Sequence, residues 1–314
     1  MEKFSSFDRV IGKASESEKK GILLESEAMF ADQIFEDLEG KEREKTPEEL
    51  VIISLANDLT NEVRREYGLE NFDIPEKNIH VIYKKDWPKD RGMAHYFSML
   101  QGIAIQEEIV KVAFLKKIFH EMLHFKSYNS LQVTTDEDKN VDAYRVGLTI
   151  STRDGQRKYF NNLNEAITEE ITKKYSKKLF NNSLFVEEIK QTQDLAVKYP
   201  ELITDSGEKL FETDTYYAEA ENNRPFTDKI NIKNFSYQTE RKFLDILIDK
   251  ILERNSEEFN NSDEIFEVFA KGMMTGNILP LSRLIQKTFG EGVFRQIGEL
   301  DDNAKVQMNF VNSL

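Results

Sequence analysis

The sequence predicts an α+β protein that is predominantly helical. Segments with an apolar residue about every 3.6 positions dominate both ends of the 314-residue chain, whereas short β-branched and aromatic runs gather in its middle. Helices and strands therefore occur in separate blocks and not in βαβ alternation. We expect an N-terminal helical segment over 1–76, a core with strands over 77–175 and a helical C-terminal subdomain over 176–314.

Two helices are predicted in the N-terminal segment. The first corresponds to SESEKKGILLESEAMFADQIFEDLEGKE, which follows a helical period and ends near Gly40. The second corresponds to TPEELVIISLANDLTNEVRREYGL and has a complete start signal. Thr46 can cap the helix, Pro47 stands where a missing N–H costs nothing, and Glu49 completes a capping box. Gly68 is expected to end it.

The middle of the chain changes to strand-like patterns. NIHVIYKKDW predicts a strand over 78–84, and QGIAIQ predicts a second short strand over 101–106. A helical pattern resumes at Glu107 and runs through KIFHEMLHFK. This last stretch contains two of the histidines of the chain and a glutamate between them.

A hairpin and further helices follow. AYRVGLTISTRDGQRKYF predicts two strands around Asp154-Gly155, a pair suited to the positive φ of a tight turn. NNLNEAITEEITKKYSKKLF then predicts a helix capped by Asn162 or Asn164. After about residue 180 the chain is expected to be mainly helical, as in ERKFLDILIDKILERN and SDEIFEVFAKGMM.

Composition limits the classes of function. A net charge of −14 argues against nucleic acid as a partner, because neutralising phosphates requires clustered Lys and Arg. The absence of cysteine excludes disulfides and thiolate zinc sites, so any metal must be held by histidine and carboxylate. No run approaches the roughly 18 apolar residues of a membrane span, and no signal peptide is recognisable. We therefore expect no membrane association and a cytoplasmic location.

The motif His120-Glu121-x-x-His124 predicts a zinc site. Residues four apart lie one turn apart on one helix face, so the two imidazoles can bind one ion. Glu121 is rotated by about 100° from His120 and flanks that ion, where a general base for a zinc-activated water belongs. The chain has only four histidines, and two of them occur in this spacing. A half-buried helix with two hydrogen-bonded histidines is the alternative.

A third ligand must come from elsewhere in the chain. Ser127 and Ser130 occupy the positions where the metzincin motif continues with glycine and histidine, so that family is excluded. Two acidic residues remain. Glu165 lies near the start of the predicted helix that follows the hairpin, and Asp142 lies just before the hairpin.

The segment Asn164-Glu165-Ala166-Ile167-Thr168-Glu169 resembles the N-E-x-x-S-D signature of thermolysin-like gluzincins, a family of zinc metallopeptidases. The resemblance implies a zincin-like core, made of a short sheet, the HExxH helix and a glutamate helix. It also implies that Glu165 is the third zinc ligand and that Glu169 holds His120. A ligating histidine generally needs such an acceptor for its other ring N–H, which favours Glu165 over Asp142.

The chain also differs from the gluzincin pattern. The gap between the two motifs is longer and contains the predicted hairpin, Glu169 replaces an aspartate, and no histidine follows His124 to stabilise an oxyanion. Another donor must take that role. The candidates are Tyr216, Tyr217, Tyr237, His80, His95, Arg145 and Arg241, of which we select Tyr217 and Tyr237 as catalytic. Zincin folds also bind the substrate backbone on an edge strand, and QGIAIQ either forms this strand or is an ordinary packed strand.

These residues predict a zinc metalloendopeptidase that cleaves a protein or peptide substrate with Zn²⁺ as its cofactor. Two other classes remain open. The chain could be a catalytically inactive zinc-binding or peptide-binding regulatory module, or an acidic helical interaction protein in which HEMLH is a coincidence. The presence of Glu121 favours the enzyme, because a structural zinc site needs no base and usually closes with four protein ligands.

Overall fold

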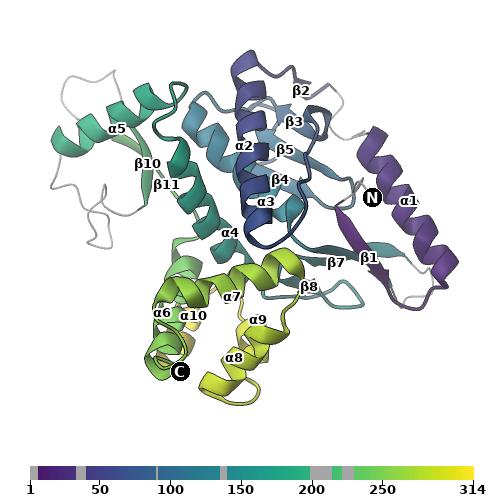
Figure 1. The fold of residues 1–314 in the computed structure, drawn as a ribbon. Helices are drawn as coiled ribbons and strands as arrows, with labels where there is room; N and C mark the ends of the chain where they lie inside the picture. Colours follow the sequence, from purple (N-terminus) through teal and green to yellow (C-terminus); the bar gives the residue numbers. More distant parts are fainter. Residues whose placement is uncertain (1–5, 33–39, 90, 135–139, 199–213, 221–229) are drawn as a thin grey trace.

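The computed structural model shows a mixed α/β protein in which helix (54%) exceeds strand (17%), and its sheets are small (Figure 1). The predicted helix-rich α+β class is therefore confirmed. The structure describes residues 6–32, 40–89, 91–134, 140–198, 214–220 and 230–314.

Helices and strands occur in the following order. The helices are α1 (Glu16–Asp32), α2 (Pro47–Glu66), α3 (Lys111–Lys126), α4 (Asn161–Ser176), α5 (Val186–Lys198), α6 (Gln238–Arg254), α7 (Ser262–Thr275), α8 (Leu279–Phe289), α9 (Val293–Gly298) and α10 (Ala304–Ser313). The strands are β1 (Phe7–Ile11), β2 (Glu42–Arg43), β3 (Ile79–Ile82), β4 (Ala94–Phe97), β5 (Gly102–Gln106), β6 (Asn129–Val133), β7 (Val141–Val146), β8 (Thr149–Ser151), β9 (Lys158–Tyr159), β10 (Thr215–Ala220) and β11 (Ile230–Asn234). Among the described helices, none has the length and apolar character needed to cross a membrane.

A four-stranded sheet with the order β2-β3-β5-β4 lies next to α2 and α3. β5 pairs in parallel with β3 and antiparallel with β4. Both predicted strands are confirmed, but β5 (the QGIAIQ strand) is interior, so its interpretation as the substrate-binding edge strand is wrong. Its small and β-branched residues are almost all buried, which suits a central position. The two edges are formed by β2 and β4, neither of which the sequence analysis predicted.

A five-stranded sheet with the order β1-β6-β7-β8-β9 follows α3 in the chain, with β1 added in parallel to β6. The predicted turn at Asp154-Gly155 joins β8 to β9, and Gly155 has a φ of +68°. A second, tighter turn precedes it, because Val146 pairs with Thr149 and leaves only Gly147 and Leu148 between β7 and β8. The segment thus forms two successive hairpins instead of one.

Helix starts follow the sequence in one case and depart from it in another. At α2 the predicted capping box is present, with Thr46 and Glu49 each bonded to the other's backbone N–H. At α4 the predicted caps Asn162 and Asn164 both lie inside the helix, and the residue at the cap position is Phe160, with a φ of +60°. Both asparagines make tertiary hydrogen bonds instead of capping bonds.

The C-terminal half is less uniformly helical than predicted. β10 and β11 form an antiparallel hairpin in a segment expected to be helix, and this hairpin packs against α5 (Figure 1). The helices α6 to α10 lie together, away from α5 and the β10–β11 pair, and α6 packs against α4 (Figure 1). The predicted end of the first helix near Gly40 follows residues 33–39, which lie outside the described residues.

The helix α3 lies between the two largest hydrophobic clusters. One face contributes Phe119 and Leu123 to a cluster with α4 and the C-terminal helices. The other contributes residues such as Phe114 and Met122 to a cluster with the four-stranded sheet and α2. Each cluster contains residues from all three expected segments, 1–76, 77–175 and 176–314, so the hydrophobic packing crosses both expected boundaries. Because α3 is packed on all sides, its side chains have well-defined positions.

Candidate metal centre

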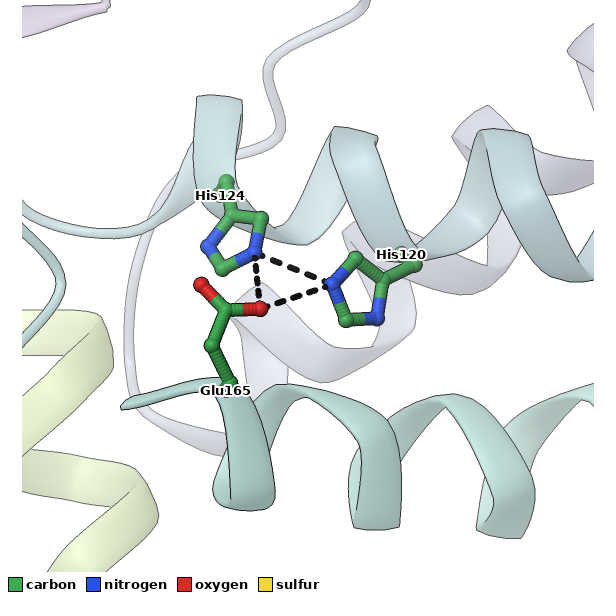
Figure 2. A group of neighbouring side chains, drawn as sticks. All are labelled: His120, His124 and Glu165. Carbon is green, nitrogen blue, oxygen red and sulfur yellow. Dashed lines mark hydrogen bonds and ion pairs between the residues drawn. The ribbon is translucent and has the colours of Figure 1, made fainter. Parts of the chain in front are cut away.

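Three side chains from two helices converge on one point. His120 and His124 project from successive turns of α3, and Glu165 projects toward them from α4, which packs against α3 (Figure 2). The Nε2 atoms of the two histidines lie 3.1 Å apart. Glu165 Oε2 lies 3.2 Å from His120 Nε2 and 3.3 Å from His124 Nε2. The three donor atoms therefore form a nearly equilateral triangle.

This triangle fits a zinc ion. Ligands about 2.0–2.1 Å from a tetrahedral Zn²⁺ lie about 3.3 Å from one another, close to the observed separations. Two imidazoles and a carboxylate are also a donor set typical of zinc. Three protein donors leave a fourth tetrahedral position for water or substrate. Within the described part of the chain, these residues form the one group of histidine and acidic side chains arranged to hold a metal.

The other ring nitrogen of His120 is held by Glu169. Its Nδ1 lies 2.7 Å from Glu169 Oε2, one turn of α4 beyond Glu165. The second oxygen of Glu169 accepts from Lys116 Nζ at 2.7 Å and from the backbone N–H of Ser236. Glu169 is completely buried, so these bonds fix its position and with it the orientation of His120.

The electrostatics of the cluster favour a bound cation. Burial lowers the pKa of His120, but the carboxylates of Glu165 and Glu169 outweigh it and raise the pKa to about 10. Burial raises the pKa of Glu165, but His124 and His120 hold it well below its usual range. Burial likewise opposes ionisation of Glu169, yet His120 and Lys116 lower its pKa to about 2. The two carboxylates thus favour a positive charge at the position of His120.

Two supporting residues were missed by sequence reasoning. Lys116 bonds Glu169 from one turn before His120 on the metal helix. Asn164 lies beside His124, with Nδ2 3.4 Å from His124 Nδ1, while its Oδ1 accepts from the backbone N–H of Leu148 at 2.8 Å. Asn164 is the first residue of the NEAITE motif, so the motif itself could have indicated it. Lys116 could have been noted only from its i−4 spacing to His120.

The donor triangle opens into a cavity of about 510 Å³. Glu121 and Tyr237 line this cavity together with the three donors. The lining also includes residues of the edge strand β4, of the turn after it, and of β7, β8 and β9. The cavity thus borders both sheets and the donor triangle.

Tyr237 stacks on His120 of the donor triangle. Its ring is nearly parallel to that of His120, with centroids 5.6 Å apart and an interplanar angle of 14°. It starts α6 with a φ of +57°, a conformation that is uncommon for a bulky residue. Burial raises the pKa of the Tyr237 hydroxyl, and the negative charges of Glu165 and Glu121 raise it further. The hydroxyl is therefore protonated and can donate a hydrogen bond at neutral pH.

The structure does not bring Tyr217 into the cavity. Its hydroxyl donates to Glu219 at 2.9 Å on β10, outside the cavity wall. Of the remaining candidates, only His95 and Arg145 line the cavity. Tyr216 packs on Phe235, His80 bonds Glu42, and Arg241 pairs with Glu170 and Asp214.

Arg145 was a candidate donor to the oxyanion and Asp142 a candidate third metal ligand, but the structure gives both residues other partners. The Arg145 guanidinium donates to three backbone carbonyls, those of Gly147, Gly272 and Gly276. Asp142 lies on β7, where its Oδ1 accepts from the N–H of Ala143, and it is not part of the donor group. Glu165 is therefore the acidic residue placed beside the histidines.

No protein-family model matches the chain, and searches of curated proteins and of solved structures find no match either. The chemistry of the site must therefore be inferred from its own residues. The donor set, its hydrogen-bond partners and the adjoining cavity are the observations available for that inference.

Proposed function

We propose that the protein is a zinc metalloendopeptidase of the gluzincin type, which hydrolyses peptide bonds in a protein or peptide substrate. The observation that carries the proposal is the triangle of His120, His124 and Glu165 in one cavity with Glu121. The spacing of the triangle fits zinc, and the neighbouring carboxylate supplies the base that hydrolysis requires. The resemblance of HEMLH and NEAITE to gluzincin motifs supports the same assignment.

When bound, zinc would supply Lewis acidity, lowering the pKa of a coordinated water to about 7 and polarising the substrate carbonyl. Glu121 would accept a proton from the attacking water as the new C–O bond forms. It would then deliver that proton to the amide nitrogen as the C–N bond breaks. His120 and His124 hold their positions because Glu169 and Asn164 contact their other ring nitrogens.

Tyr237 is the proposed donor to the negative charge that develops on the carbonyl oxygen. Its ring lies on His120 at the edge of the donor triangle. Its neighbour Ser236 donates a backbone N–H to Glu169 and accepts a bond from Lys116 at 2.8 Å, so the start of α6 is fixed to the site. A hydroxyl that is already positioned stabilises developing charge without reorganisation.

The edge strand β4 is the proposed binding surface for the substrate backbone. It pairs on one side with β5, and all four of its residues line the cavity. An extended peptide can add to such an edge through main-chain hydrogen bonds, which tolerate many side-chain sequences. The substrate is therefore expected to bind in an extended conformation across the donor triangle.

An inactive zinc-binding regulatory module is the main alternative. A structural zinc site closes with four protein ligands, but the group in the described residues has three. Such a module also has no need of a carboxylate at position 121. An acidic interaction protein without a metal would not need three donors at ligand spacing. These features favour the enzyme over both alternatives.

The first experiment is zinc content per chain, measured by elemental analysis of protein purified without added metal. We expect about one zinc in the wild type and in Asp142→Ala, and loss of zinc in Glu165→Ala. Hydrolysis of an unfolded protein and of a quenched fluorescent peptide library would be measured on the same samples. Zinc retained in Glu165→Ala, or zinc-loaded wild type without hydrolysis of any substrate, would contradict the proposal.

A further inference from the structure

Lys158 lines the cavity into which the donor triangle opens. In the sheet register Val146 pairs with Thr149, and Ser151 pairs with Lys158. Paired residues and alternate residues of antiparallel strands share a face, so these four side chains lie on the same side of the sheet. All four also line the cavity, and Lys158 is exposed within it.

No carboxylate of the described residues forms an ion pair with Lys158. Arg145, the other cation of the cavity, has its donors occupied by backbone carbonyls. The two carboxylates that line the cavity are Glu165 and Glu121, which the proposed function uses as metal ligand and base. Lys158 is therefore a cation that remains available to a bound molecule.

A second cation acts on the same part of the cleft. The Arg91 guanidinium lies over the ring of Phe97, which lines the cavity from β4, at 5.3 Å from its centroid. Burial lowers the pKa of His95 on the same strand; Glu121 opposes this effect, and Arg91 and Lys158 add to it. Arg91 and Lys158 lie on different segments of the chain, and the positive charge of each lowers the pKa of His95.

This local charge contrasts with the protein as a whole, which carries a net charge of −14. Lys158 lines a cavity that is proposed to bind peptides, and no carboxylate of the described residues pairs with it. With the metal site loaded, the charges on the cavity wall sum to a positive value, because Zn²⁺, Arg145 and Lys158 outweigh Glu121 and Glu165. A negatively charged group on the substrate would complement this wall.

We propose that the cleft selects peptides with a carboxylate near the cleaved bond, and that Lys158 is the residue that determines this specificity. The inference rests on the peptidase function proposed above and adds the substrate class. The carboxylate belongs either to an Asp or Glu side chain or to the C-terminus of a short peptide. A side-chain carboxylate and a C-terminal carboxylate both pair with an ammonium group. The two differ in how far the carboxylate lies from the cleaved bond.

The test measures peptide binding separately from hydrolysis. Zinc-loaded Glu121→Gln protein would be titrated into fluorescent peptides, with anisotropy as the readout. One peptide series carries Glu at successive positions and an amidated C-terminus. A second peptide carries Gln and a free C-terminus, and a third carries Gln and an amidated C-terminus. The variants Lys158→Gln and Lys158→Arg would be made in the same background, with Lys305→Gln as a control of equal charge change on the exposed face of α10.

We expect one carboxylate peptide to bind about threefold to fivefold more tightly than the neutral peptide, a ratio typical of one partly exposed charge pair. The preference should disappear in Lys158→Gln, persist in Lys158→Arg and Lys305→Gln, and weaken as salt is raised. Equal binding of all peptides, no binding of any, or a preference that survives Lys158→Gln would overturn the inference. Hydrolysis of neutral peptides by the wild type alongside such a result would leave the peptidase function intact.

Discussion

Glu121 and Tyr237 reach the donor triangle from α3 and from the start of α6, and neither is itself a donor. Each can therefore be changed without removing a metal ligand. In Glu121→Gln we expect zinc content to stay at the wild-type level, whereas kcat falls by about 10²–10⁴-fold, because the amide cannot accept the proton of water. Zinc analysis and peptide hydrolysis would be measured together, with Glu48→Gln on the exposed face of α2 as the control. Full activity in Glu121→Gln would refute the proposed general base.

The two tyrosines selected from the sequence are separated by the structure, and this gives a paired test. Tyr237→Phe removes a hydroxyl beside the triangle, so kcat should fall by about 10–10³-fold with little change in KM. Tyr217→Phe removes a hydroxyl bonded to Glu219 outside the cavity, so kcat should stay near the wild-type value. Steady-state kinetics on one quenched peptide would measure both. Similar losses in the two variants would argue against Tyr237 as a direct donor to the substrate.

The sequence predicted the residues of the donor triangle from spacings within single helices. His120 and His124 are four residues apart, and the four-residue spacing of Glu165 and Glu169 places both on one face of α4. The role of Lys116 could not be predicted, because it depends on the long-range approach of Glu169 and Ser236. Residue spacing thus predicts which groups share a helix face, but not which group on another element meets them.

At the scale of elements, the turn between β7 and β8 supports the glutamate helix. Gly147 has a φ of +58°, and a Cβ at this position would lie 2.3 Å from Asn164 Oδ1. We expect Gly147→Ala to displace Asn164 and to weaken zinc binding at least tenfold, because Asn164 contacts His124 and precedes Glu165. Competition with a chromogenic zinc chelator would measure the affinity.

Gly155 offers a matched control in the neighbouring hairpin. Its φ is +68°, so Gly155→Ala has similar backbone strain, but the nearest atom to the added Cβ is 3.3 Å away. We expect a loss of about 1 kcal/mol in stability and an unchanged zinc affinity. Equal weakening of zinc binding in both variants would show that strain in the sheet, and not the displacement of Asn164, is responsible.

A partly buried ion-pair network joins the glutamate helix to α6 and to the residue before β10. Asp214 pairs with Lys173 on α4 and with Arg241 on α6, each at 2.8 Å. Burial raises the pKa of Asp214, but Arg241 and Lys173 together lower it below its ordinary value. Because the unfolded chain then binds the proton more readily than the folded protein, the stability from this carboxylate is lost as pH falls.

Asp214→Asn should therefore lower the free energy of unfolding by about 1–2 kcal/mol at pH 7. The difference from the wild type should begin to shrink as the pH falls to the ordinary pKa of aspartate, and it should disappear below the lowered pKa of Asp214, where the folded wild-type carboxyl is protonated as well. Urea unfolding at a series of pH values would measure both, with the exposed Asp302→Asn as control. A difference that does not depend on pH would assign the effect to packing.

Long, strongly periodic elements were predictable, and short ones were not. The helices α2, α3 and α6 follow from their apolar spacing, and α2 also has a capping box at its start. β4 has four residues, and it becomes a strand only because β5 is available as a partner. β1 likewise depends on β6, which lies more than a hundred residues later in the chain. Such pairings have no local signature, which is why the edge strand of the cleft was assigned to the wrong segment.

At the scale of the whole molecule, the metal site connects the parts of the fold. α3 belongs to both major hydrophobic clusters, and Glu165 and Glu169 join it to α4. Glu188 on α5 accepts from the N–H groups of Lys111 and Val112 at the start of α3, which attaches the β10–β11 unit to the same helix. Occupancy of the site should therefore affect the unfolding of the protein as a whole and not only that of a loop.

Zinc should accordingly stabilise the fold. The three donors come from two helices, α3 and α4, and meet only in the folded protein, so zinc would bind the folded state and not the unfolded chain. A ligand that binds only the folded state at a free concentration of 1,000 times its Kd adds about 4 kcal/mol, which corresponds to a rise in Tm of about 5–10 °C for a chain of this size. Calorimetry with and without a chelator should show this rise in the wild type and in Asp142→Ala. Glu165→Ala should show none, because it lacks the donor that joins α4 to α3 through the ion; an equal rise in Glu165→Ala would place the stabilising ion elsewhere in the protein.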